Sequence, residues 1–114
     1  MINTVTLVGR LVKDAEVKKL ENGKSVCNIT LATQRSYKDS TGEYETDFID
    51  CTLWGNVAQS TGEYCKKGDM LGVKGRLQTN FREKDGTEIK ELKVIAEKVS
   101  FLSRSNINKD DIER

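Results

Sequence analysis

Glycines placed inside and between short β-type segments are the feature that most restricts what this chain can fold into. The Asn-Gly pair at 22–23 and the Asp-Gly pair at 85–86 tolerate positive φ and are typical of tight hairpin turns. Gly9, Gly72 and Gly75 lie inside the segments, where glycine indicates a bulge or a sharp bend. Strands that bend this strongly close into a barrel, so the pattern predicts a small β-barrel.

The order of the predicted elements specifies the barrel further. Five strands are predicted, at about residues 4–12, 25–34, 46–54, 70–81 and 88–101. A helix follows the third strand, with Asn56 and Gln59 as a capping box and Gly68 as its stop. The polar stretch 35–46 is predicted to be a long exposed hairpin loop with residues 39–43 at its tip. The fold class is therefore all-β, a five-stranded OB-fold Greek-key barrel with one short helix between strands three and four.

A chain of 114 residues is long enough for one domain with one modest core. We assign residues 1–103 to the barrel domain, and residues 104–114 are predicted to be a polar, disordered tail. Cys27, Cys51 and Cys65 lack CxxC spacing and are predicted to be buried free thiols in a reducing compartment. No signal peptide and no apolar run long enough for a membrane span is found, so a cytoplasmic protein is expected.

The charged and catalytic residue types limit the classes of function. The chain has no histidine, which removes the commonest general base and the commonest zinc ligand. No pair of carboxylates stands out, so we expect no enzyme, no metal site and no cofactor. Because 19 Lys and Arg face 18 Asp and Glu, any site for a polyanion must come from local segregation of charge.

The third predicted strand separates an apolar face from a mixed face. Alternation places Ile49, Cys51 and Leu53 on the core side, and Phe48, Asp50, Thr52 and Trp54 on the outer side. Exposed aromatic rings forfeit burial and need a reason. Stacking on nucleobases is one reason. Cover by the helix, a loop or another subunit is the other, and alternation alone favours neither.

Cations interleave with further aromatic residues. Tyr37 lies between Arg35 and Lys38, and Arg82 directly follows Phe81. Lys74 and Arg76 are predicted on the outer face of the fourth strand, and in the last strand Leu92, Val94 and Ala96 alternate with Lys93, Ile95 and Glu97. Rings interleaved with Lys and Arg form a basic groove with stacking platforms, which favours binding of single-stranded nucleic acid.

Several segments are similar to the bacterial single-stranded DNA-binding protein (SSB) family. They are 5–11 (VTLVGRL), 28–33 (NITLAT), 47–55 (DFIDCTLWG), 64–68 (YCKKG) and 73–79 (VKGRLQT). They occur in the family's order and cover nearly all of residues 1–103. The resemblance implies sequence-independent binding and protection of single-stranded DNA during replication, recombination or repair.

The resemblance also implies roles for individual residues. Base stacking falls on Tyr37, Phe48, Trp54 and Phe81. Phosphate contacts fall on Arg10, Arg35, Lys38, Lys67, Lys74, Arg76 and Arg82. Phe81 comes about one residue earlier than the family pattern, and by strand parity it points inward with Leu77 and Thr79 unless a bulge intervenes.

The family further implies a homotetramer in which the first strand pairs between subunits, located in the cytoplasm at the nucleoid. Replicative members usually continue into an acidic Pro-Phe tip that recruits replication and repair proteins. This chain has no proline and ends at Arg114, so it is expected to be either a truncated chain or a short accessory, plasmid or phage-type member. Recruitment of protein partners through the usual tip is not expected.

Three rival functions remain at this point. A replication-restart OB protein would use the same barrel as a protein-docking hub and would bind strand weakly. An RNA-binding OB module would prefer RNA over DNA of equal sequence. A nuclease would require cleavage that depends on a divalent metal.

Overall fold

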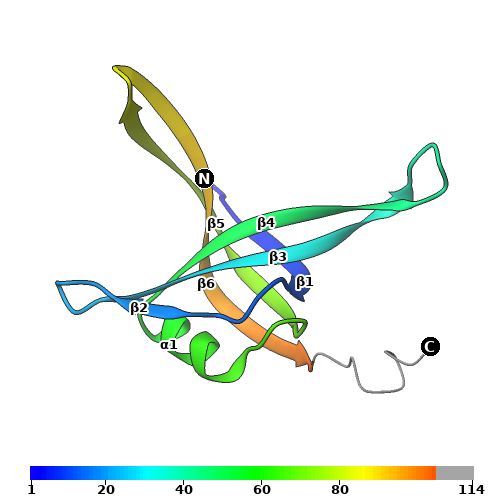
Figure 1. Cartoon of the computed structure of the whole chain (residues 1–114), viewed down its shortest axis with the longest axis horizontal. Coiled ribbons are helices and arrows are strands. Elements are labelled where there is room, and N and C mark those ends of the chain that lie inside the picture. Colours follow the sequence, from blue (N-terminus) through cyan, green and yellow to red (C-terminus); the bar gives the residue numbers. More distant parts are fainter. Residues whose placement is uncertain (105–114) are drawn as a thin grey trace.

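The computed structural model describes residues 1–104 of the chain, which form six strands and one helix (Figure 1). In chain order these are β1 (Val5–Leu11), β2 (Val17–Lys19), β3 (Ser25–Lys38), β4 (Tyr44–Trp54), α1 (Gly55–Tyr64), β5 (Met70–Lys84) and β6 (Thr87–Ser103). The five long strands and the helix correspond to the predicted elements. The three-residue β2 is an addition that pairs only with β3.

The long strands close into a barrel. The sheet order is β1-β5-β6-β4-β3-β2, and a further pairing of β1 with β3 joins the ends. All pairings are antiparallel except that of β4 with β6, which is parallel. Leu11, Ile29, Leu31, Leu53, Leu71 and Val73 are the largest apolar side chains fully buried inside. The predicted OB-fold is confirmed.

Two of the glycines predicted to bend strands lie where the barrel closes. A Cβ on Gly75 would overlap the carbonyl oxygen of Ile95, and the register of β5 with β6 shifts between Lys74 and Gly75. The tight curvature predicted for Gly75 thus coincides with a bulge in the neighbouring strand, where Glu97 of β6 is left without a partner in the register. β1 keeps its register with β5 through Gly9, where a Cβ would lie 2.7 Å from the Ala32 carbonyl oxygen. Gly9 thus allows β3 to approach β1 closely, without a bulge.

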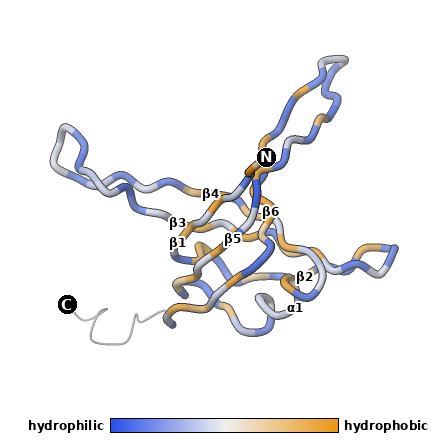
Figure 2. The backbone as a smooth tube through the Cα atoms, turned by 180° about the vertical axis from the view of Figure 1, so that it is seen from behind, coloured by the Kyte–Doolittle hydropathy of each residue, from blue (hydrophilic) through white to orange (hydrophobic). Residues whose placement is uncertain are grey.

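Two hairpins continue beyond the barrel and diverge from it (Figures 1 and 2). We call residues 33–48 the β3–β4 arm and residues 77–92 the β5–β6 arm. The predicted hairpin turn at 39–43 is confirmed, but the loop is shorter than the predicted 35–46, because β3 runs to Lys38 and β4 begins at Tyr44. The side chains of residues 35–46 are mostly polar, which suggested a loop. A two-stranded hairpin with solvent on both faces, however, does not need an apolar face. The turns predicted at 22–23 and 85–86 are confirmed, with positive φ at Gly23, Asp85 and Gly86.

Helix α1 covers one end of the barrel and buries Ala58 and Thr61 (Figure 1). The predicted capping box is wrong, because the helix begins directly after Trp54 with no side-chain cap. The Gln59 amide instead donates a hydrogen bond of 2.8 Å to the Ser25 hydroxyl. The helix ends at Tyr64, and Gly68, with φ of 89°, belongs to the turn that leads into β5.

The three cysteines are free and buried, as predicted. Burial raises the pKa of Cys51 to about 11, which makes its thiol a poor nucleophile. Arg104 begins the predicted tail, yet it donates a hydrogen bond of 2.8 Å to the Tyr64 carbonyl and lies against the Phe101 ring. The rest of that predicted tail, 105–114, lies outside the described residues. Within residues 1–104, no helix has the length and apolar character needed to cross a membrane.

Candidate nucleic-acid interface

The outer face of β4 carries two exposed aromatic rings. Phe48 is 67% exposed and Trp54 is 43% exposed, whereas Cys51 and Leu53 on the alternate positions are buried. The alternation predicted for this strand is therefore confirmed. Neither α1 nor a loop of the described chain covers these rings, although the helix starts directly after Trp54.

A cavity of about 620 Å³ lies on the same face between the two rings. Its β3–β4 side consists of Asn28, Thr30, Asp50 and Thr52, and its other side is residues 91–93 of β6, with Lys13 also in the lining. A second cavity, of about 490 Å³, lies beside Trp54 and is lined by Lys24 and Gln59 among others. The first cavity therefore lies on the outer face of β3 and β4 between the two rings, and the second lies beyond Trp54 at the start of α1.

The floor between the rings is polar and internally bonded. The Thr30 hydroxyl donates to Oδ1 of Asp50 at 2.6 Å, and the Thr52 hydroxyl donates to Oδ1 of Asn28 at 3.0 Å. Both pairs are direct cross-strand neighbours in the β3–β4 register. These bonds hold the short polar side chains flat against the sheet, which leaves room above them for a stacked ligand.

The β3–β4 arm adds a ring that the sequence analysis did not single out. Tyr44 is 47% exposed, and the Lys38 ammonium lies 5.7 Å from the centre of its ring. Alternation along β4 puts Tyr44 on the same face as Phe48, and that alternation was the signal that could have identified it. Tyr37 is 66% exposed within an irregular stretch where the β3–β4 register shifts between Gln34 and Lys38.

The β5–β6 arm exposes Phe81 by 61% and Leu92 by 66%. Phe81 keeps the parity of Leu77 and Thr79, as predicted, but this part of the face lies beyond the barrel and is open to solvent. The Phe81 ring therefore stays exposed although it lies on the side of β5 that faces the core within the barrel. Leu92 pairs with Thr79 and lines the 620 Å³ cavity, and its exposure was missed because its apolar character suggested the core.

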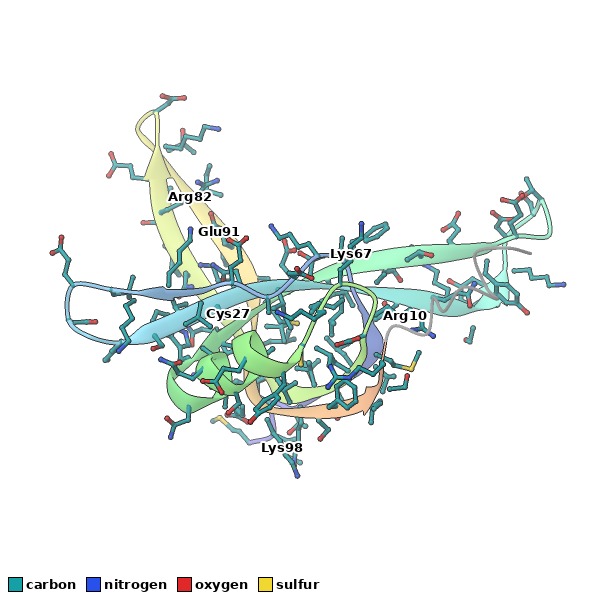
Figure 3. The ribbon with its side chains drawn as sticks, turned by 60° about the horizontal axis from the view of Figure 1, so that its bottom comes forward. Arg10, Cys27, Lys67, Arg82, Glu91 and Lys98 are labelled. Carbon is teal, nitrogen blue, oxygen red and sulfur yellow. The ribbon has the colours of Figure 1, made fainter. Side chains whose placement is uncertain are left out.

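The four arginines predicted as phosphate contacts all have partners within the chain. Arg35 bonds the Asp47 carboxylate at 2.9 and 3.1 Å and also pairs with Glu45, so the pKa of Arg35 is raised and that of Asp47 is lowered. Arg82 pairs with Glu91, and Figure 3 shows these two side chains together on the β5–β6 arm. Arg76 lies 3.6 Å from Glu97, and Arg10 donates to the Gly68 carbonyl at 2.9 Å.

The three lysines of the predicted set differ from these arginines. Within residues 1–104, Lys38, Lys67 and Lys74 form no ion pair. They do not share one groove, because Lys74 is paired in register with Lys98, and Figure 3 shows Lys98 far from Lys67 and Arg82. The structure thus places Phe48 and Trp54 on one face of β4 and leaves the predicted cations distributed around the barrel.

The fold and this face define an OB-fold protein with an open, ring-lined groove suited to an extended ligand. The model of the single-strand binding protein family matches residues 2–102, so the chain belongs to this family. That match agrees with the resemblance noted in the sequence.

Individual relatives agree with the family. The chain is 42% identical over 103 residues to single-stranded DNA-binding protein B of Bacillus subtilis (strain 168), covering 90% of this chain and 91% of that protein. It is 44% identical over 107 residues to the single-stranded DNA-binding protein of Bacillus cereus, covering 93% of this chain and 63% of that one.

A solved structure supports the same conclusion. It is the crystal structure of a deletion mutant of the single-stranded DNA binding protein from Thermus aquaticus, with a TM-score of 0.76 and 29% identity. The match covers 90% of this chain and 51% of that one, so the chain spans about half of its length.

Proposed function

We propose that this chain binds single-stranded DNA without sequence requirement and protects it during replication, recombination or repair. The observation that carries the proposal is the pair of exposed rings, Phe48 and Trp54, at the two ends of a polar hollow. Trp54 follows Phe48 by six positions along the strand, about 20 Å at the usual rise, which is room for a run of unpaired nucleotides. Tyr37 and Phe81 on the two arms extend the stacking surface.

Binding in this mechanism is passive and involves no covalent chemistry. Bases splay onto the rings, and cations neutralise phosphates and release counterions. Lys38, Lys67 and Lys74 are free to do so at once. Arg10, Arg35, Arg76 and Arg82 contribute only if phosphate replaces their present partners. Duplex DNA binds poorly because its bases are already stacked on one another.

We extend the proposal to assembly and location. A homotetramer fits the exposed edge of β1, because within the described chain β1 pairs with β3 only at Arg10 and Leu11. Light scattering after size-exclusion chromatography tests this, and a monomeric mass contradicts it. The proposed location is the cytoplasm, at the nucleoid. Replication or repair proteins are the proposed partners, through surfaces other than an acidic Pro-Phe tip.

The test uses Trp54, the only tryptophan, as a fluorescent reporter. The chain is titrated with oligo-dT, a matched duplex and oligo-rU at two salt concentrations. Strong quenching by oligo-dT alone, weaker at the higher salt, is the expected result. No quenching by any nucleic acid would contradict the proposal and favour a protein-docking role, and stronger quenching by oligo-rU would favour an RNA-binding role.

A variant separates stacking from a structural role of the same ring. Trp54→Ala should weaken oligo-dT binding by about 1–3 kcal/mol, because one base loses its stacking partner. Binding is followed by anisotropy of a labelled strand, since the reporter is removed. Unchanged circular dichroism is the control, and collapse of the fold would assign Trp54 to the core.

A further inference from the structure

The side chain of Asn3 takes the place of a strand backbone at the base of the β5–β6 arm. The antiparallel ladder of β1 with β5 ends at Val5 opposite Gly75, and the same register brings residue 3 opposite Leu77. There the Asn3 amide nitrogen donates to the Leu77 carbonyl at 2.7 Å, and the Asn3 amide oxygen accepts from the Leu77 N–H at 2.9 Å. One side-chain amide thus satisfies both backbone groups of Leu77, as a paired peptide unit would.

Leu77 is also the residue at which the β5–β6 arm leaves the barrel. Figures 1 and 2 both show the N-terminus beside the base of this arm. The register of β5 with β6 shifts just before it, between Lys74 and Gly75. Beyond Gly75, β5 pairs only with β6 among the strands of the described chain. The two Asn3 bonds therefore hold an edge of β5 with which no other strand of that part of the chain pairs.

The cross-strand row that contains Leu77 is the row at which the binding cavity opens. Leu77 pairs with Val94 of β6, and Val94 is the first β6 residue that pairs with β4, opposite Cys51. Residues 91–93, which we call the cavity wall, come directly before Val94, have no partner in the β4 ladder and line the 620 Å³ cavity. The cavity therefore lies where β6 separates from β4, and Asn3 stands at the far end of the same row.

We propose that Asn3 is a positioning residue for the strand-binding groove, which acts through Leu77 and Val94 to hold the cavity wall at a fixed separation from β4. The inference rests on the proposed binding of single-stranded DNA and adds a determinant of its affinity. Asn3 lines neither cavity of the binding face, so its effect on binding is indirect. Without its two bonds, binding must also order the cavity wall, and affinity falls.

The experiment compares Asn3→Ala with the unmodified chain by anisotropy of labelled oligo-dT. The dissociation constant should rise about threefold, which is within the net effect of one or two hydrogen bonds. The slope of log K against log salt should not change, because no cation is removed. Hydrogen exchange of the Leu77 amide should become faster. The matched control is Thr4→Ala, exposed on the same segment and without a side-chain hydrogen bond within residues 1–104, which should change none of these values.

A double-mutant cycle separates positioning from a general loss of stability. Leu92 is exposed in the cavity wall, and Leu92→Ala removes the apolar part of that wall. In the Leu92→Ala background, Asn3→Ala should weaken binding by a clearly smaller factor, because the part of the wall that it positions is already missing. A lower melting temperature with an unchanged dissociation constant, or the same loss of affinity in both backgrounds, overturns the role of Asn3.

A second variant carries the test if Asn3→Ala does not fold. Asn3→Asp keeps an acceptor for the Leu77 N–H and loses the donor to the Leu77 carbonyl, so it should weaken oligo-dT binding with the same dependence on Leu92. Absence of binding to every oligonucleotide by the unmodified chain overturns the proposed function instead, so the two failures are distinguishable.

Discussion

The β3–β4 arm and the β5–β6 arm are built alike but held differently. In the β3–β4 arm, the Asp39 carboxylate accepts hydrogen bonds from the backbone of Thr41 and Glu43, and Arg35 joins both strands through its carboxylate pairs. The β5–β6 arm closes with the two-residue turn at 85–86 and has the Arg82 pair with Glu91 as its one ion pair in the described chain. One arm is restrained by polar contacts, and the other has fewer of them.

The exposed side chains follow the same division. The β5–β6 arm presents Leu77, Phe81 and Leu92 to solvent with no layer above them. In the β3–β4 arm, the Lys38 ammonium lies 5.7 Å from the centre of the Tyr44 ring. Phe48 is exposed but pairs with Ala32, which also pairs with Arg10 of β1, so the backbone of Phe48 lies where the barrel closes. Tyr37 on this arm is as exposed as Phe48. The β3–β4 arm therefore has a backbone restrained before binding, at Phe48 by the barrel and elsewhere by polar contacts, whereas the β5–β6 arm offers apolar surface that gains cover when a ligand arrives.

The largest expected effect compares the glycines at the roots of the two arms. Gly75→Ala should lower the free energy of unfolding by about 3 kcal/mol or more, because its methyl group would overlap the Ile95 carbonyl. Gly9→Ala should lower it by about 1–2 kcal/mol, because its contacts with Ala32 and Thr33 are less severe. Urea denaturation followed by circular dichroism gives both values. Equal losses of unfolding free energy would contradict closer packing around Gly75, at the base of the β5–β6 arm, than around Gly9.

The next comparison concerns the rings of the two arms. Phe48→Ala should weaken binding of oligo-dT by about 1–3 kcal/mol, because the backbone that carries the ring lies in the closed barrel, opposite Ala32. Phe81→Ala should weaken binding by about 1 kcal/mol or less, because its ring lies on the arm beyond the barrel, away from the cavity between Phe48 and Trp54. Tryptophan fluorescence titration reports both, with melting temperature as the control. A larger loss of binding free energy for Phe81→Ala than for Phe48→Ala would show that the β5–β6 arm contributes more to base stacking than the β3–β4 arm.

A smaller effect is expected in the salt dependence of DNA binding, which compares a cation without an ion pair, Lys38, with a paired cation, Arg35, on the β3–β4 arm. Lys38→Gln should reduce the slope of log K against log salt by about 0.7, as expected for one lost contact with a single strand. Arg35→Gln should leave the slope unchanged, because Asp47 and Glu45 already occupy the guanidinium. Titrations at four salt concentrations give the slopes. A reduced slope in Arg35→Gln would show that phosphate displaces the carboxylates.

The smallest effect depends on pH. Arg35 lowers the pKa of Asp47, so this pair stabilises the arm above the ordinary carboxyl range, and the contribution is lost as pH falls through the lowered pKa. Carboxyl NMR titration should show that Arg35→Gln returns Asp47 towards its ordinary pKa. The side chains are largely exposed, so little change in global stability accompanies the shift. A pKa that does not move in the variant would remove the basis for calling this arm restrained.

Sequence patterns predicted the barrel well because its constraints are local. Positive φ at Gly23 and Gly86 and the close contact at Gly75 can be satisfied only by glycine or a few other residues. The alternation of β4 is maintained because one of its faces meets the core. Where such a constraint exists, the sequence specifies the local structure uniquely.

The arms were predicted less well because the constraint there disappears. Without a second layer, polar residues such as those at 35–38 continue a strand as readily as they form a loop, and an apolar residue such as Leu92 can lie in solvent. The pairing of Arg35 with Asp47 joins β4 to a part of β3 that was predicted to be loop. Whether a cation is free to bind phosphate depends on such tertiary partners, which the sequence does not show. Whether a ring on β4 faces outward depends only on the alternation of side chains along the strand.

The ladder between β5 and β6 pairs without further shift from Gly75 to Lys84 opposite Thr87. Side chains along such a ladder repeat every two residues, so adding two residues to each strand near the tip lengthens the arm and leaves both faces as they are. Adding one residue to each strand reverses the faces only beyond the insertion. The turn at 85–86 is thus a position where the hairpin can grow or carry an inserted peptide in steps of two, while the barrel and the binding face keep their geometry.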